Sequence, residues 1–123
     1  MTIDEAIKKV DSLKPNNYTE SEKIIWLSNL DEIIKTEIMD QYEGFDETVF
    51  SGYDDSTPVS TELLAPSQYD DVYLYWLESR IDYYNAEYAK YNNSVTAFNT
   101  AYSSLNRYYN RTHMPLGNKM KYF

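Results

Sequence analysis

Cysteine is absent from this chain of 123 residues, and histidine occurs only once, at position 113. Without cysteine there is no disulfide framework and no thiolate chemistry, which fits a reducing compartment. A single histidine leaves too few ligands for a zinc-type site. No run of eighteen apolar residues occurs, so we expect no membrane-spanning helix.

Catalytic motifs are missing as well. The sequence contains no G-x-S-x-G pattern, no nucleotide-binding glycine loop and no H-E-x-x-H pattern. The adjacent carboxylates Asp54-Asp55 and Asp70-Asp71 could do acid–base work in principle, but an acidic chain contains such pairs by chance. We therefore expect no enzymatic activity, no cofactor and no tightly bound metal.

Acidic residues are missing from the last part of the chain. All twenty lie at or before Glu87, where six basic residues accompany them and leave a charge of −14. Residues 88–123 hold five basic residues and no acid, which brings the net charge to −9. Two interpretations stay open: an ordinary solvated surface, or a bipolar subunit whose basic end meets an acidic partner, such as another copy of itself. The acidic majority argues against nucleic-acid binding.

Two helices are expected in the first part of the chain, at 3–13 and 20–42. Thr2 with Glu5, and Thr19 with Glu22, have the spacing of a capping box, in which the hydroxyl and the carboxylate each accept a backbone N–H. Pro15 stops the first helix. The apolar face of the second helix is so broad that we expect this helix at the centre of the fold. Its apolar residues are Ile24, Ile25, Trp26, Leu27, Leu30, Ile33, Ile34 and Ile38.

Residues 44–66 have no helical periodicity and contain two glycines and two prolines. Gly44 is well placed as the left-handed cap that ends the second helix. The segment is acidic, but it lacks the alternating ligands, the glycine and the distal glutamate of a calcium loop. Its acids are Asp46, Glu47, Asp54, Asp55 and Glu62. We expect a long acidic loop.

Tyrosine is concentrated in the segment that follows: ten of the fourteen tyrosines lie between Tyr69 and Pro115. Eleven large residues recur there with an average spacing of 3.6 residues, the period of an α-helix. They are Tyr73, Leu77, Ile81, Tyr84, Tyr88, Tyr91, Val95, Phe98, Tyr102, Leu105 and Tyr109. Ser67 and Asp70 predict its capped start, and the unbroken phase favours one helix over 68–110. Asparagines and a serine at 92–94 are its weak point, where a break would make a helical hairpin.

These patterns predict an all-α fold, a small bundle of three to four helices with one long C-terminal helix or a helical hairpin. Residues 1–115 would form a single helical domain that carries the acidic loop at 44–66. Residues 116–123 would form a basic flexible tail.

Tyrosine packs its ring while its hydroxyl stays wet, so a tyrosine-rich helix face suits a half-buried surface that meets other chains. Stacking on single-stranded bases is an alternative use of such rings, although helical spacing favours packing against protein. The basic residues near the C-terminus extend this candidate surface. The expected interaction residues are Tyr84, Tyr88, Tyr91, Tyr102, Arg107, Tyr109, Arg111, Lys119 and Lys121.

Residues 63–115 resemble small proteins of the structural modules of tailed phages and prophages of Gram-positive hosts. The segments that carry the resemblance are Tyr69 to Leu77, Asp82-Tyr83-Tyr84-Asn85, Tyr91-Asn92-Asn93 and the ending Tyr109 to Pro115. The N-terminal half is similar in plan, with Trp26-Leu27 and Leu30-Asp31 on a long helix after a short one. The pattern is similar to that of the all-helical head–tail connector proteins, also called adaptor or head-completion proteins.

That resemblance implies a virion protein, present in the host cytoplasm during assembly, that forms a ring beneath the portal. Its partners would be further copies of itself, the portal and the tail-completion proteins. Two other classes stay open: an acidic helical inhibitor that mimics nucleic acid, and a cellular helical scaffold. An inhibitor would need its carboxylates on one exposed face, whereas here they are scattered over helices and loop.

Overall fold

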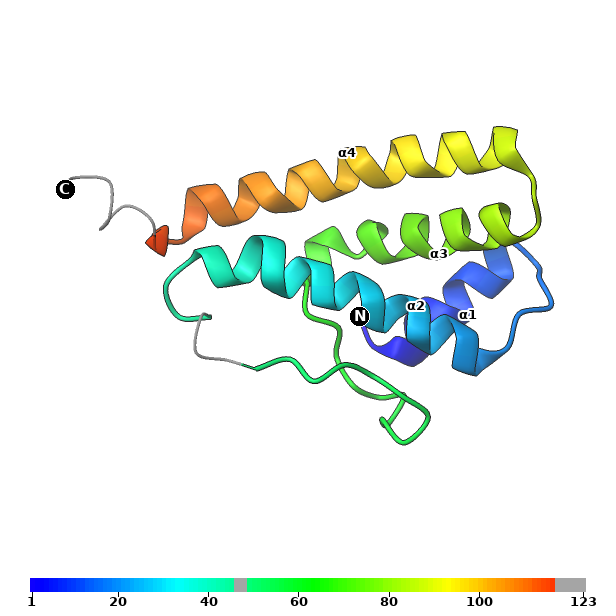
Figure 1. Cartoon of the computed structure of the whole chain (residues 1–123), viewed down its shortest axis with the longest axis horizontal. Coiled ribbons are helices and arrows are strands. Elements are labelled where there is room, and N and C mark those ends of the chain that lie inside the picture. Colours follow the sequence, from blue (N-terminus) through cyan, green and yellow to red (C-terminus); the bar gives the residue numbers. More distant parts are fainter. Residues whose placement is uncertain (46–48, 117–123) are drawn as a thin grey trace.

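A computed structural model describes residues 1–45 and 49–116, and within these residues the fold is all-α, with no strand (Figure 1). The four α-helices are α1 (Ile3–Leu13), α2 (Glu20–Ile33), α3 (Asp71–Tyr84) and α4 (Tyr88–Thr112). The expected all-α bundle is therefore confirmed. None of these helices is apolar over the length that a membrane crossing needs, as far as the described residues go.

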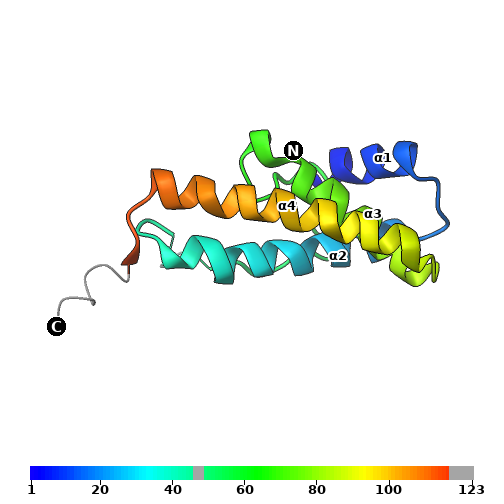
Figure 2. The same ribbon diagram turned by 90° about the horizontal axis from the view of Figure 1, so that it is seen from above.

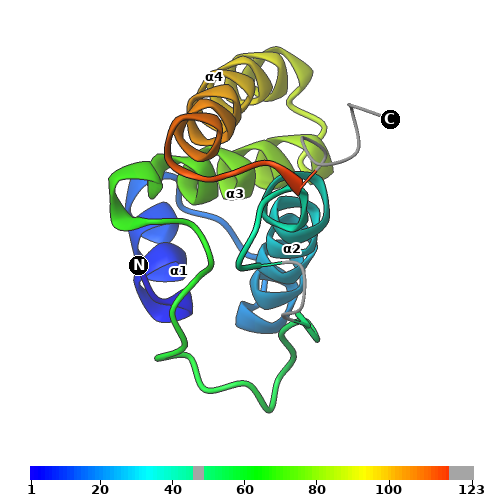
Figure 3. The ribbon, with the colours of Figure 1, turned by 90° about the vertical axis from the view of Figure 1, so that its left-hand side faces the viewer.

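The helices pack around one apolar core, with α3 in the middle and α1, α2 and α4 arranged around it (Figure 3). The expectation that the second helix is central is wrong. Its outward face carries Ile25, which is 53% exposed, whereas both flanks of α3 are covered. Figure 2 shows α4 and α2 running alongside each other. The fully buried side chains include Ile3, Val10, Leu27, Leu30, Ile34, Ile38, Val72, Tyr73, Leu77, Ile81 and Leu105.

The start of α1 is the expected capping box. The Thr2 hydroxyl accepts the Glu5 N–H at 3.1 Å, and the Glu5 carboxylate accepts the Thr2 N–H at 2.9 Å. Thr19 caps α2 by accepting the N–H of Glu22 at 3.1 Å. Ser67 makes no such cap: Ser67–Tyr69 form a 3-10 turn, and α3 begins after Asp70 with no side-chain cap bond. The third capping prediction is therefore wrong.

The second helix extends almost as far as expected, but its winding changes. The α-helix ends at Ile33 and continues as a π-helical turn, Ile34–Ile38, and a 3-10 turn, Met39–Gln41. The wider turn places Lys35 inside the protein, where its ammonium pairs with Asp40 and donates to the Phe45 carbonyl at 2.9 Å. The π-helical turn thus coincides with a buried lysine and its partners. The apolar periodicity of the sequence does not reveal this change in helix type.

The C-terminal half is a helical hairpin, so the expected single helix over 68–110 is wrong. The break lies at residues 85–87, where Ala86 adopts a φ of 59°, and not at 92–94, which are continuous in α4. A straight helix of about 60 Å would carry its second half away from the core. The turn instead brings Leu105 and Tyr109 back to bury against the rest of the bundle. Asn92 and Asn93 are tolerated because they are exposed.

The described part of the 44–66 segment contains no helix and runs along α2 towards the start of α1. The N–H of Ile3 donates to the Thr61 carbonyl at 3.0 Å, and the N–H of Asp4 donates to the Val59 carbonyl at 2.9 Å. Gly44 has the expected left-handed conformation, with a φ of 95°, but it is not the helix cap, because the 3-10 turn ends at Gln41 and Tyr42 caps it in an extended conformation. Gly52 is also left-handed, and a Cβ there would lie 3.0 Å from the Ser28 hydroxyl. These bonds hold the segment against the helices.

Candidate interaction surfaces

The residues predicted to make contacts are divided among different parts of the bundle. Tyr84 and Tyr88 are 56% and 60% exposed. Tyr91 is half-buried, and Arg107 and Arg111 are exposed. Lys119 and Lys121 lie outside the described residues. The eleven-residue stripe is therefore not one continuous face, because the turn at Ala86 divides it.

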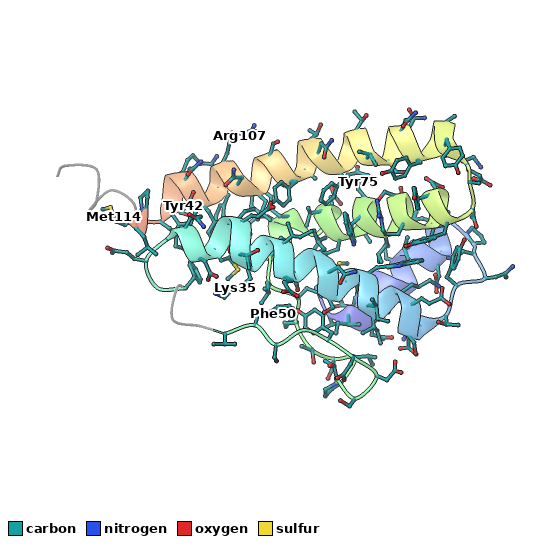
Figure 4. All side chains as sticks on the ribbon, viewed as in Figure 1. Lys35, Tyr42, Phe50, Tyr75, Arg107 and Met114 are labelled. Carbon is teal, nitrogen blue, oxygen red and sulfur yellow. The ribbon has the colours of Figure 1, made fainter. Side chains whose placement is uncertain are left out.

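Tyr109 is buried, so it is not offered to a partner by the single chain. It belongs to a cluster of rings where the C-terminal end of α4 meets Tyr42 and Phe45, just after the 3-10 turn. Tyr42 and Met114 mark this end of the molecule in Figure 4. His113 stacks on Tyr109 with the ring centres 4.9 Å apart, and Phe45 approaches edge-on at 5.7 Å. The Tyr42 hydroxyl donates to the Asn110 side chain, and the Glu43 N–H donates to the Met114 carbonyl at 2.9 Å. The sequence alone did not reveal this internal use of Tyr109.

Tyr102 is also engaged within the chain. Its ring is half-buried, and its hydroxyl donates to the Glu37 carboxylate at 2.8 Å. Burial and this acidic neighbour raise the pKa of the Tyr102 phenol. The bond links the middle of α4 to the π-helical turn, so Tyr102 has a structural use in the single chain.

The opposite end of the hairpin carries a second group of rings, of which Trp26 is buried and three tyrosines are exposed. We call Tyr18, Trp26, Tyr83, Tyr84 and Tyr88 the aromatic end. Tyr84 stacks on Trp26 with the ring centres 5.6 Å apart and the planes 6° from parallel, and Tyr18 meets Trp26 edge-on at 5.4 Å. Tyr83 crosses Tyr84 at 5.2 Å. Tyr83 and Tyr84 are thus held in place by ring contacts while 46% and 56% exposed. Tyr88, at the start of α4, is 60% exposed beside them.

The Arg80 side chain packs against rings next to the aromatic end. The sequence patterns did not single out this residue. Its guanidinium lies 4.5 Å from the Trp76 ring centre, 5.6 Å from Tyr83 and 5.8 Å from Tyr91. Cation–π attraction of this kind orders both the cation and the rings. The available signal was spacing, because Trp76 and Tyr83 lie four residues before and three residues after Arg80, on the same helix face.

Among the residues that the structure describes, two carboxylates are fully buried in the bundle. Asp31 accepts hydroxyl donors from Tyr73 at 2.6 Å and from Tyr53, and the Leu64 N–H at 3.1 Å. Burial raises the pKa of Asp31 despite these bonds, and the neighbouring phenols of Tyr53 and Tyr73 also have raised pKa values. This carboxylate is sealed from solvent and saturated with donors, so its use is to tie the loop to α2 and α3.

The second buried carboxylate, Asp82, joins three helices. Both of its oxygens accept from the Lys14 ammonium at 2.7 Å, and one also accepts from the Ser94 hydroxyl at 2.7 Å. Lys14 follows α1, Asp82 lies on α3 and Ser94 lies on α4. Among the described residues, no three His, Cys, Asp or Glu side chains are grouped as a metal site would require.

The face of α4 that points away from the bundle is polar and mostly uncharged. A shallow hollow of about 400 Å³ there is lined by Thr96, Asn99, Thr100, Ser103 and Arg107. A neighbouring groove of about 510 Å³ between α3 and α4 shares Thr96 and Thr100 and includes Tyr75. On the other side of the molecule, the 49–64 segment forms a groove of about 490 Å³.

These features make two kinds of surface available: exposed, ordered rings at the aromatic end, and a polar α4 face ending in two arginines. Comparison with family models, with curated proteins and with solved structures finds no match for this chain.

Proposed function

We propose that this chain is a structural protein of a tailed phage or prophage, a head–tail connector subunit that self-associates in a ring and bridges the portal and the tail. The proposal starts from the sequence resemblance of residues 63–115. The structural observation that supports a role in assembly is the aromatic end, where ring contacts hold Tyr83 and Tyr84 in fixed positions while about half of each residue is exposed, next to the exposed Tyr88.

Tyrosine, tryptophan and arginine are the residues that dominate the buried centres of protein interfaces. The aromatic end offers exposed tyrosines, with Arg80 next to them, and the Tyr84 ring is already fixed by its stack on the buried Trp26. A side chain that is ordered before binding loses less conformational entropy when a partner covers it. This end therefore suits contact with the portal or a tail-completion protein.

The bundle that carries this surface is braced by buried polar contacts. Asp82 connects α1, α3 and α4, and Asp31 connects the loop to α2 and α3. Such multiply bonded carboxylates specify one arrangement of the helices. A rigid subunit that presents fixed rings is suited to a repeated structural contact.

The experiment replaces the gene in its phage or prophage with one encoding Tyr84→Ser with Tyr88→Ser, and counts heads joined to tails by electron microscopy. We expect tail-less heads to accumulate. The matched control, Tyr84→Phe with Tyr88→Phe, keeps both rings and should give joined particles. Circular dichroism and the melting temperature of both purified variants check that the bundle is intact. Joined particles at the wild-type level after deletion of the gene would show that the connector role is wrong.

A further inference from the structure

The outer face of α4 can be buried by a partner with a small loss of hydrogen bonding and of side-chain entropy. The hydroxyl of Thr96 donates to the Asn92 carbonyl at 2.8 Å, and that of Thr100 donates to the Thr96 carbonyl at 3.1 Å. A partner lying on this face would therefore leave those donors satisfied. Short side chains such as threonine, asparagine and serine also lose less rotamer freedom on burial than lysine or glutamate.

Positive charge at the C-terminal end of this face is not neutralised by an ion pair with any described residue. Arg107 points away from the bundle (Figure 4), and its hydrogen bond is to the Ser104 hydroxyl at 3.2 Å. Arg111 is exposed one helical turn further on. The ion pairs of the described residues include neither arginine, whereas Lys90 on the same helix is paired with Glu87 at 3.1 Å. Two cations are thus free for a partner.

A complementary surface lies on the 54–62 segment, which we call the loop face. Asp54, Asp55 and Glu62 are exposed there, beside the groove of about 490 Å³ that Thr57, Pro58 and other residues line. The turn is ordered, because Asp54 accepts the Ser56 N–H at 2.8 Å and the Thr57 N–H donates to the Asp54 carbonyl at 3.0 Å. Hydrogen bonds from the Ser56 hydroxyl, at 2.6 Å, and from its N–H lower the pKa of Asp54.

The two surfaces face in opposite directions. Figures 1 and 3 show α4 along one side of the molecule and the 49–66 segment along the other, with the remaining helices between them. A contact between them cannot be formed within one chain. It also joins two different patches, so it is heterologous, and its repetition gives a ring where the rotation closes and a filament where it does not.

We infer that copies of this chain join head to tail, with the outer face of α4 in one copy docking on the acidic loop face of the next. The inference depends on the self-association in the proposed function and names the two surfaces involved. Arg107 and Arg111 face Asp54, Asp55 and Glu62 across the contact. Each exposed pair contributes little by itself, so the contact needs several pairs and the uncharged part of the α4 face together.

The test uses two charge-reversed variants of the full chain. One has Arg107→Glu with Arg111→Glu, which makes the α4 face acidic, and the other has Asp55→Lys with Glu62→Lys, which makes the loop face basic. A control with Lys8→Glu and Lys9→Glu has the same change in net charge as the first variant, at exposed positions on α1. Sedimentation velocity across a concentration series measures association, and circular dichroism checks that each variant is folded.

We expect each charge-reversed variant alone to associate at least about tenfold more weakly than the wild type, because like charges then meet across the contact. The control should associate like the wild type. Mixed in equal amounts, the two variants should assemble again, because each acidic α4 face then meets a basic loop face and each basic α4 face an acidic one. Raising the salt concentration should weaken wild-type assembly, because exposed charges are screened beyond about 10 Å at 0.1 M.

The possible failures are distinguishable. If the wild type assembles and the arginine variant assembles equally well, the proposed contact is wrong while the ring remains possible through other surfaces. If only the arginine variant is affected, the α4 face docks on another surface and the loop face has no part in the contact. If the wild type stays monomeric at every concentration, self-association itself is wrong, and with it both the ring and this contact.

Discussion

Tyr73 and Asp31 lie 42 residues apart in the sequence and meet inside the bundle, where the tyrosine hydroxyl donates to the carboxylate at 2.6 Å. The same hydroxyl accepts the N–H of Ala65 at 2.7 Å. One phenol therefore connects α3, α2 and the end of the 49–66 segment. Both side chains are fully buried, so neither can exchange its protein partner for water.

Replacing Tyr73 by Phe should destabilise the fold by about 1–3 kcal/mol, because the Ala65 N–H loses its acceptor and Asp31 loses a donor in the interior. Tyr102→Phe is the matched comparison, since its hydroxyl bonds to the exposed Glu37, which water can solvate. We expect Tyr102→Phe to lower the free energy of unfolding by less than about 1 kcal/mol. Urea unfolding followed by circular dichroism measures both, and equal effects would contradict the structural role of the Tyr73 hydroxyl.

The raised pKa of Asp31 makes a prediction about pH. Because burial raises the pKa of the folded carboxyl above its ordinary value of 3.8, the folded state takes up a proton at a higher pH than the unfolded state does. Protonation of Asp31 therefore adds stability as pH falls through the folded pKa, and the contribution is lost as pH rises through it. Other carboxylates also titrate in this range and change the free energy of unfolding. The measurement must therefore compare the wild type with a variant that lacks the Asp31 carboxyl.

Asp31→Asn provides that difference, because asparagine has a similar shape and does not titrate in this range. Its stability relative to the wild type should be greater at neutral pH than near pH 4, since only the wild type gains from protonation at this position. Urea unfolding of both proteins between about pH 7 and pH 4 measures the relative stability. A difference that stays constant with pH would show that the Asp31 pKa is not raised.

Replacing Lys14 by Met should be strongly destabilising, because it leaves the fully buried Asp82 carboxylate without its cation. Removal of one member of a buried pair costs about 3–5 kcal/mol. The lower end applies here, because the Lys14 side chain keeps 26% of its exposure to water. Adding Asp82→Asn to Lys14→Met should recover part of the loss. A double variant less stable than Lys14→Met alone would argue against this account.

Ala86→Gly should stabilise the hairpin. Ala86 has a φ of 59°, where an L residue with a Cβ pays about 1–2 kcal/mol and glycine does not. We expect a gain of about 1 kcal/mol after the greater freedom of glycine in the unfolded chain is subtracted. Ala97→Gly, inside α4, is the opposite control and should lose about 1 kcal/mol. Thermal unfolding of the two variants distinguishes them by the sign of the change in melting temperature.

The starts of α1 and α2, which depend on neighbouring residues, were predictable, whereas the cap expected at Ser67 was not formed. Thr2 and Glu5 form the expected box, Thr19 caps α2, and Gly44 has the expected left-handed backbone. The two threonine caps each satisfy a backbone N–H three residues further along the chain. The exposure of Tyr84 and Tyr88 is compatible with the predicted contact surface. Periodicity could not show that Tyr109 is buried and packs against Tyr42.

The sequence by itself determined the helical class, the acidic segment between the helical halves and the basic character of the last third, because composition and period are local properties of the chain. Only the tertiary structure decided where the tyrosine-rich segment turns, why α2 widens around Lys35, and which hydroxyls reach Asp31. A straight helix satisfies the backbone as well as a hairpin does. The hairpin is favoured because only the turn at Ala86 lets Leu105 and Tyr109 reach the core and Ser94 reach Asp82, and these contacts join residues that the sequence keeps far apart.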